Sequence, residues 1–130
     1  AKIFRKNESI SIYGTDDFWT GVPSVGTEFL DNNRDFRIFI SHNPDFISNT
    51  IRRHKICFDL ALAGHTHGGQ ICLPGLGPLG GYGVKDRFFF TGTKTVEESL
   101  IHISRGIGVV DIPYRINSAP EVSIITLDKA

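Results

Sequence analysis

Three histidines in this 130-residue sequence have the residue type and the spacing to bind a metal ion. His65 and His67 lie in a glycine-flanked segment, residues 64–69 (GHTHGG), and His42 lies in residues 40–45 (ISHNPD). In an extended chain, residues i and i+2 point to the same side, so we expect both imidazoles of the H-x-H to do so. The glycines allow a sharp turn and leave room for a ligand. Imidazole is a common ligand of first-row metals, so the sequence predicts a divalent metal site at His42, His65 and His67.

Short apolar runs that predict buried strands precede the histidines. Residues 37–41 (RIFIS) come before His42, and residues 59–64 (DLALAG) come before His65. Between them, apolar residues at helical intervals predict a helix from Asp45 to about Arg53. A strand, a helix and a strand in this order predict parallel neighbours, whose carboxyl ends meet at one edge of a sheet. We therefore expect the three imidazoles to converge there.

The remaining segments predict one α/β unit whose C-terminal half is mostly sheet. Alternating or compact apolar residues predict strands at residues 9–13, 88–90, 100–104 and 121–127. Residues 20–33 could hold a brief helix. Residues 73–83 are rich in Gly and Pro and carry leucines, which predicts a loop. This loop either covers a substrate, touches a lipid or is an ordinary connection.

The other histidines and the cysteines point to no second site. His54 follows two arginines near the predicted helix end, where a cation is favoured, so we expect it on the surface. His102 alternates with apolar neighbours and should lie on the outer face of its strand. Cys57 and Cys72 have neither a C-x-x-C nor a zinc-finger spacing. We expect two reduced thiols, with one disulfide in an oxidising compartment as the alternative.

Composition limits the classes of partner. The chain has 14 Lys and Arg against 14 Asp and Glu, so it offers no basic field for nucleic acid or an anionic membrane. No apolar run approaches the roughly 20 residues of a membrane helix. We expect a cytoplasmic location and leave peripheral membrane contact open. The chain begins with Ala1 and has no Met, which fits a segment of a longer chain.

The motifs, taken in order, resemble those of a known enzyme family. Residues 40–45 and 59–71 (DLALAGHTHGGQI) resemble the second half of a calcineurin-like metallophosphoesterase. Shorter motifs resemble one bacterial branch, the phosphodiesterases of the YaeI and YkuE type, at residues 13–17 (YGTDD), 104–108 (SRGIG), 113–115 (PYR) and 120–122 (PEV). The resemblance implies the C-terminal half of a four-layer α/β/β/α sandwich, a mixed sheet with one or two helices. Residues 1–130 would form one partial phosphoesterase domain.

The resemblance also implies roles for residues of this chain. The histidines matching His42 and His65 bind one metal in that family, and the histidine matching His67 binds the other. Two divalent ions, Mn, Fe or Zn, would thus serve hydrolysis of a phosphoester substrate, in this branch a phosphodiester. Arg105 and Arg115 could contact the substrate phosphate, or could lie at the surface or at strand ends. Asn43 could orient a ligating histidine or cap the following helix.

Half of the family's motif set is missing. The bridging carboxylates come from D-x-H, G-D-x-x-D and G-N-H-[DE] motifs, and this sequence has none of them. We therefore assign no catalytic residue, and we expect the chain alone to be inactive and to hold at most one metal weakly. The missing N-terminal half, or another chain, should cover an exposed sheet face. Two alternatives remain: a single-zinc hydrolase with three histidine ligands, and a non-catalytic half-domain that packs with a partner chain.

Overall fold

The sheet and its helix dominate the structure, a computed structural model that describes residues 1–5, 8–27, 35–80 and 83–128. Six strands form one mixed sheet in the order β1-β2-β3-β4-β8-β7. Their bounds are β1 (Lys2–Arg5), β2 (Glu8–Gly14), β3 (Phe36–Ile40), β4 (Leu60–Ala63), β7 (Gly92–Val96) and β8 (Ser99–Ile103). The helix α1 spans Pro44–His54. A mixed sheet with one helix confirms the predicted α/β class.

The four central strands run parallel, and the two edge strands run antiparallel to them. β2, β3, β4 and β8 pair in parallel, whereas β1 pairs antiparallel with β2, and β7 with β8. The β3-α1-β4 unit is therefore the predicted β-α-β unit. Pairing continues past the strand ends, because the Gly64 amide donates to the His42 carbonyl at 3.1 Å. The loops that follow the four parallel strands thus begin at one edge of the sheet.

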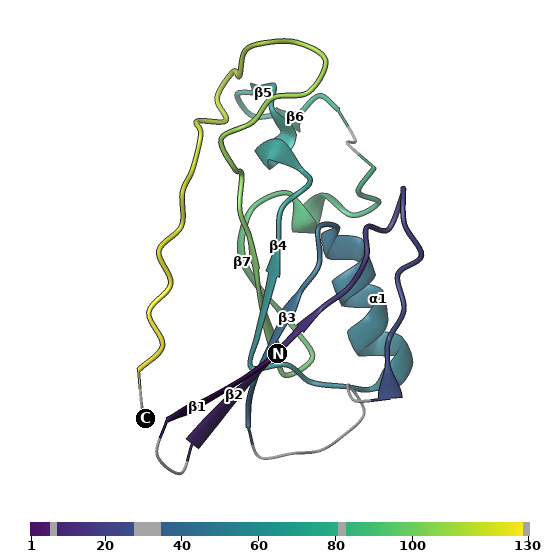
Figure 1. Ribbon diagram of the computed structural model, residues 1–130. Helices are drawn as coiled ribbons and strands as arrows, with labels where there is room; N and C mark the ends of the chain where they lie inside the picture. Colours follow the sequence, from purple (N-terminus) through teal and green to yellow (C-terminus); the bar gives the residue numbers. More distant parts are fainter. Residues whose placement is uncertain (6–7, 28–34, 81–82, 129–130) are drawn as a thin grey trace.

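Helix α1 covers one face of the sheet (Figure 1). Asn43 caps its start by accepting hydrogen bonds from the amides of Asp45 and Phe46. Basic residues fill its last turn, where they favour the helix dipole. The core between helix and sheet consists of fully buried apolar side chains, among them Phe39, Ile47, Ile51, Ala61, Ile101 and Ile103. Phe39 stacks on Phe58 with ring centroids 4.7 Å apart.

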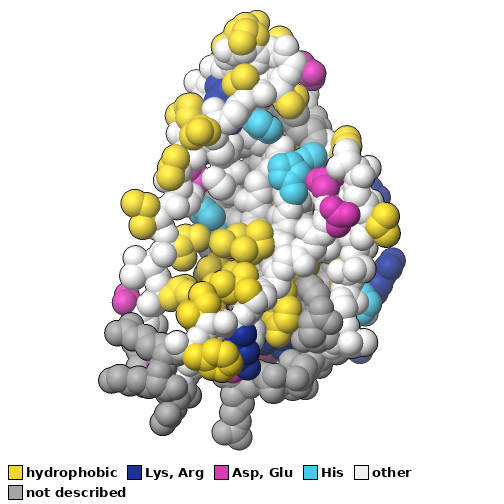
Figure 2. All heavy atoms as spheres, viewed as in Figure 1, with side chains coloured by type: hydrophobic (Ala, Val, Ile, Leu, Met, Phe, Trp, Pro, Cys, Tyr) yellow, Lys and Arg dark blue, Asp and Glu magenta, His cyan; other side chains and the backbone are white. Residues whose placement is uncertain are grey.

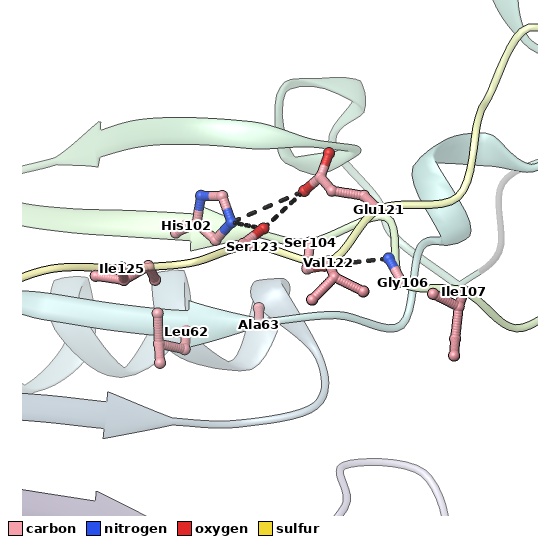
Figure 3. A pocket seen from close by; sticks show the side chains of 10 residues that line it. All are labelled: Leu62, Ala63, His102, Ser104, Gly106, Ile107, Glu121, Val122, Ser123 and Ile125. Carbon is pink, nitrogen blue, oxygen red and sulfur yellow. Dashed lines mark hydrogen bonds and ion pairs between the residues drawn. The ribbon is translucent and has the colours of Figure 1, made fainter.

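The opposite face of the sheet is also apolar, and no described helix covers it. The strand register places Ile12, Ile38, Leu60 and Leu100 in one row across four strands. Leu100 is 43% exposed, as is Ile40 in the neighbouring row. The C-terminal segment, residues 119–128, runs along this side and leaves a cavity of about 350 Å³ against β4 and β8 (Figures 1 and 3). Figure 2 shows hydrophobic side chains gathered in the lower half of this view.

Two predicted strands are wrong. Residues 88–90 form a turn of 3₁₀-helix, η3 (Arg87–Phe89), because the Asp86 carboxylate accepts from the Phe88 amide at 2.9 Å and caps it. Residues 121–127 form no strand because β4 and β7 already occupy both sides of β8. Side chains hold this segment instead, with the Ser123 hydroxyl 2.8 Å from Nε2 of His102. The C-terminal half is therefore less sheet-rich than predicted.

Other expectations meet the structure in part. The loop predicted at residues 73–83 includes a two-stranded ribbon, β5 (Cys72–Leu73) with β6 (Gly77–Pro78), and its residues 81–82 lie outside the described residues. The brief helix expected within residues 20–33 falls partly on residues 28–33, which also lie outside the described residues. Residues 20–26 form no helix. Within the described ranges, no helix has the length and apolar character needed to cross a membrane.

Candidate metal centre

The side chains with metal-binding chemistry gather where the parallel strands end. The loop after β2 carries Asp16 and Asp17, and the loop after β3 carries His42. The loop after β4 carries His65 and His67. In open α/β sheets, ligands bind in the crevice outside these carboxyl ends. The topology therefore positions the predicted residues as the strand–helix–strand argument requires.

His42 and His65 form a close pair. Their imidazoles pack edge to face, with ring centroids 4.9 Å apart and ring planes at 78°. His42 is exposed to solvent, and His65 is partly buried. Each residue lies two positions past the end of its strand, and backbone hydrogen bonds continue the pairing between β3 and β4 up to Gly64 and His42, so the sheet sets where the two histidines leave it. Two of the three predicted ligands are thus brought together.

The loop after β2 supplies two neighbours of this pair that the sequence analysis missed. Trp19 packs its indole edge-on to His65, with ring centroids 5.3 Å apart. Hydrogen bonds from the Thr20 and Trp19 amides lower the pKa of Asp17 below its ordinary value, and the nearby His42 lowers it further. The signal was available: residues 9–13 predicted a strand, and the carboxyl-end rule applies to β2 as it does to β3 and β4.

His67 lies apart from the pair because the H-x-H segment is not extended. His65 and His67 both adopt positive φ, 68° and 49°, and Thr66 between them is in the right-handed helical region. His67 begins a 3₁₀ turn, η2 (His67–Gly69). The expectation that both imidazoles point to one side of an extended chain is therefore wrong. Left-handed residues that are not glycine are strained and cluster at functional sites.

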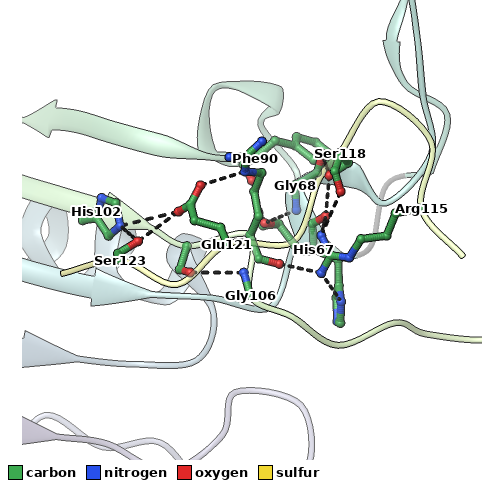
Figure 4. Close-up of polar contacts among 12 residues, drawn as sticks. His67, Gly68, Phe90, His102, Gly106, Arg115, Ser118, Glu121 and Ser123 are labelled. Carbon is green, nitrogen blue, oxygen red and sulfur yellow. Dashed lines mark hydrogen bonds and ion pairs between the residues drawn. The ribbon is translucent and has the colours of Figure 1, made fainter.

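The loop after β8 surrounds His67 (Figure 4). Nδ1 of His67 lies 3.0 Å from the Gly108 carbonyl oxygen. The carbonyl of His67 accepts from the Arg115 guanidinium at 2.9 Å and from the Ser118 hydroxyl at 2.8 Å. A Cβ at Gly68 would lie 2.7 Å from the Ser118 hydroxyl oxygen. This glycine therefore makes room for the protein's own loop.

Two buried polar residues attach the same loops to one another. The Gln70 side chain is fully buried, donates to the Val110 and Ile112 carbonyls, and accepts from the Val110 amide. The Thr66 hydroxyl, also fully buried, donates to the Phe90 carbonyl at 2.6 Å. Buried polar groups with satisfied hydrogen bonds favour a single arrangement of the loops they join. The sequence analysis assigned no role to either residue.

Arg105 and Arg115, the predicted phosphate contacts, are engaged with the protein. Arg105 donates from Nε to Glu121 at 2.7 Å. Burial alone would raise the pKa of Glu121, but the hydrogen bonds from Arg105 and Ser123 and the charge of Arg105 hold it below its ordinary range. Arg115 donates to several backbone carbonyls. Contact with a substrate phosphate stays a prediction for both residues.

Asn43 caps α1, which is one of its two predicted roles. Its carboxamide oxygen accepts from the Asp45 amide at 2.8 Å and from the Phe46 amide at 3.4 Å. The side chain is 1% exposed, and its Nδ2 atom has no hydrogen-bond partner among the described residues. The other role, orienting a ligating histidine, stays a prediction.

Comparison with curated proteins decides which known enzymes the chain is related to. It is 35% identical over 121 residues to an uncharacterized metallophosphoesterase of Bacillus subtilis, YkuE, and 34% identical over 129 residues to the phosphodiesterase YaeI of Escherichia coli. This chain is homologous to metallophosphoesterases. The alignments cover 91% and 96% of the chain, but only 40% and 44% of these relatives.

A third relative comes from a vertebrate. A zebrafish (Danio rerio) transmembrane protein with a metallophosphoesterase domain is 32% identical and is covered to 31% of its length. No protein-family model matches the chain, and no solved structure shows significant similarity to it. The chain thus spans about two fifths of the length of the bacterial metallophosphoesterases that it matches.

The donor set fits part of a metallophosphoesterase metal centre. Such enzymes use divalent metals, and the His42–His65 pair offers two neutral imidazoles, which suit Mn, Fe or Zn. Within residues 1–5, 8–27, 35–80 and 83–128, no group of three or more His, Cys, Asp or Glu side chains could hold a metal ion. His67 forms no such group with the pair, and metal binding by His42, His65 and His67 stays a prediction.

Among the described residues, no other His or Cys completes a group of three ligands with the His42–His65 pair. His54 is exposed at the end of α1, as predicted. His102 lies on the sheet face opposite to Ile101 and Ile103, where it contacts Ser123. Cys57 and Cys72 are free thiols, which confirms the first of the two predicted states. Burial raises the pKa of the Cys72 thiol above its ordinary value, which disfavours the thiolate form.

Proposed function

We propose that this chain is part of a metal-dependent phosphodiesterase and contributes three of its metal-ligating imidazoles. The paired imidazoles of His42 and His65 at the carboxyl edge of the sheet carry this proposal. The name of the Escherichia coli relative, a phosphodiesterase, supports the substrate class. The remaining ligands, including the carboxylates, would come from a part of the enzyme that this chain does not contain.

The separation of the histidines supports two metal positions. His42 and His65 would hold one divalent ion, and His67, with its own set of neighbours, would contribute to the other. Two divalent ions supply Lewis-acid polarisation of a phosphoryl oxygen and neutralise the charge that develops on it. Asp17, whose negative charge lies near His42, would help keep the positive charge at this edge compensated.

The single-zinc alternative receives no support from the arrangement. Such a site needs three imidazoles around one ion with the fourth position open to water. Among the residues that the structure describes, His67 belongs to no group of three ligands with His42 and His65. A zinc content of one tightly bound ion in the isolated chain would nevertheless favour this alternative over ours.

The sheet face opposite to α1 supports the proposal that a second structural layer packs against this chain. Its exposed apolar side chains include Ile3, Phe36, Ile40 and Leu100. Burying exposed apolar surface stabilises a protein by roughly 25 cal/mol per Å². We propose that the rest of the enzyme covers this face. The isolated chain should then self-associate in sedimentation, whereas the full-length protein should not; a monomeric isolated chain would count against this part of the proposal.

Hydrolysis of bis(p-nitrophenyl) phosphate by the full-length protein tests the function. Chelation should abolish activity, and Mn²⁺, Fe²⁺ or Zn²⁺ should restore it. The variant His65→Ala should lose about 10⁴-fold in rate, equal to about 5.4 kcal/mol of barrier. The exposed His54 provides a matched control, and His54→Ala should retain the wild-type rate. Full activity of the isolated chain, or of His65→Ala, would overturn the proposal.

A further inference from the structure

The backbone at His67 is held by residues about 50 positions further along the chain. Its carbonyl accepts three hydrogen bonds: from the Arg115 guanidinium at 2.9 Å, the Ser118 hydroxyl at 2.8 Å and the Gln70 amide at 3.0 Å. Since φ of His67 is 49°, the residue occupies a conformation that the chain alone disfavours. The three donors offset this cost and fix the left-handed turn.

All N–H groups of Arg115 are used within the protein. A guanidinium has five, one on Nε and two on each terminal nitrogen. Nε donates to the Gly108 carbonyl at 3.0 Å. Nη1 donates to the carbonyls of His67 at 2.9 Å and Ser118 at 3.2 Å. Nη2 donates to the carbonyls of Arg105 at 2.8 Å and Gly108 at 2.6 Å. These five contacts leave no N–H of Arg115 for a substrate phosphate.

The same count assigns the proton of the His67 ring. Nη2 of Arg115 also lies 3.4 Å from Nδ1 of His67, but both of its hydrogens are already donated to carbonyls. The Gly108 carbonyl, 3.0 Å from Nδ1, can only accept. Nδ1 must therefore carry the hydrogen of the neutral ring and donate it to Gly108. The lone pair then lies on Nε2.

We propose that Arg115 is a positioning residue that holds the Gly108 carbonyl against Nδ1 of His67, so that the imidazole presents Nε2 to a metal ion. The proposal rests on the proposed function, in which His67 is a metal ligand. Arg115 acts at two points: two of its N–H groups hold the Gly108 carbonyl, and a third holds the His67 backbone. Histidine ligands are commonly oriented in this way, through a hydrogen bond from the ring nitrogen that does not bind metal.

This assignment differs from a direct contact with substrate. A phosphate-binding arginine would leave its planar fork open to solvent, whereas this fork is closed by four carbonyl groups. Lysine at this position would keep the positive charge but could not reach four carbonyls with a single ammonium group. The substitution Arg115→Lys therefore separates charge from geometry.

The tautomer of His67 in the metal-free, full-length protein is the first measurement. Long-range ¹H–¹⁵N correlation spectra distinguish imidazole protonated at Nδ1 from imidazole protonated at Nε2. We expect the Nδ1–H form for wild-type His67, although free histidine in water favours the Nε2–H form. Arg115→Lys should return His67 toward that solution mixture. An Nε2–H form in the wild type would overturn the proposal without need of any variant.

Metal affinity is the second measurement, made by competition of Mn²⁺ or Zn²⁺ with a chelator. Loss of a partner of this kind costs about 10- to 100-fold in affinity, and we expect Arg115→Lys to lose that much at one of two ions. The matched control is Arg53→Lys, an exposed arginine in the last turn of α1, which should bind both ions as the wild type does. In Arg115→Ala, added methylguanidinium should restore both the tautomer and the affinity, which a general loss of structure would not allow.

The outcomes separate this proposal from the proposed function. If the enzyme binds two ions and hydrolyses phosphodiesters, but Arg115→Lys keeps tautomer and affinity, the positioning role is wrong and the function stands. If His67→Ala retains full metal content, His67 is no ligand and the positioning role is wrong, whereas the function is overturned only if the full-length protein hydrolyses no phosphodiester or keeps its activity after chelation. Should Arg115→Lys fail to fold, Ser118→Ala removes only one donor to the His67 carbonyl; it should weaken binding severalfold, and wild-type binding would contradict the proposal.

Discussion

The two histidine regions at the edge of the sheet are built in different ways. His42 and His65 lie two residues past the ends of the paired strands β3 and β4, and their ring centroids are 4.9 Å apart. His67 lies only two residues further, yet its place depends on Gly108, Arg115 and Ser118. The sheet therefore determines one region, and a loop distant in sequence determines the other. We expect substitutions to affect the two regions independently.

The largest effect concerns metal content and tests whether the regions serve different ions. Loss of either histidine that binds a given ion should already release that ion, so removing the second histidine of the same site should cause no further loss of metal. The full-length double variant His42→Ala/His65→Ala should thus still bind one ion, whereas His65→Ala/His67→Ala should bind none. Metal analysis after gel filtration measures both. Equal metal content in the two double variants would show that the three histidines share a single site.

A core substitution should weaken the region that the strands build. Phe39 in β3 is fully buried and stacks on Phe58. Phe39→Ala removes that packing and should lower the free energy of unfolding by about 3–5 kcal/mol, measured by urea denaturation. Phe88→Ala, a control at a phenylalanine that is 48% exposed, should cost less than about 1 kcal/mol. Similar losses for both would contradict the assigned core.

A glycine substitution should weaken the second region, called here the clamped region: residues 65–70 together with residues 105–118, which hold His67 in place. Gly68 has φ of +60°, and a Cβ there would lie 2.5 Å from Cγ of Arg105 and 2.7 Å from the Ser118 hydroxyl. Gly106 has nearly the same φ, +62°, but a Cβ would meet no atom within 4 Å. Gly106→Ala should cost about 1 kcal/mol for backbone strain alone. Gly68→Ala should cost about 1–3 kcal/mol more, because the loop must move away.

Acid should loosen the clamped region before the strands. The pKa of Glu121 is below its ordinary value in the folded protein, so its contact with Arg105 stabilises the fold above the unfolded pKa of about 4.3. That contribution is lost as the pH falls through the lowered pKa. Amide protection factors, which correct for the intrinsic pH dependence of exchange, should fall between pH 5 and 3 in residues 105–118 before they fall in β3 and β4. Glu121→Gln should show lower protection in residues 105–118 already at pH 5, with little further change as the pH falls.

The difference between the regions also explains what the sequence could predict. Apolar runs before His42 and His65, with a helical pattern between them, sufficed for the β3-α1-β4 unit and its histidine pair. The sequence predicted an extended chain at His65 and His67. The structure has a turn over residues 65–70 instead, and this turn depends on contacts with residues 105–118. Phe88–Phe90 was mistaken for a strand because Asp86 was not considered as a cap. Local patterns thus predicted what the sheet determines, and long-range hydrogen bonds determined the rest.

Trp19 gives the histidine pair its own optical reporter. It is the single tryptophan among the 130 residues, and its indole lies against His65. A paramagnetic ion such as Co²⁺ held by that imidazole would lie close enough to quench nearly all of its emission. An ion held by His67 alone would instead lie near the loop that contains Gly108, and we expect it to quench Trp19 less. Titrating the chain with Co²⁺ and following this emission therefore reads the occupancy of one position without any label.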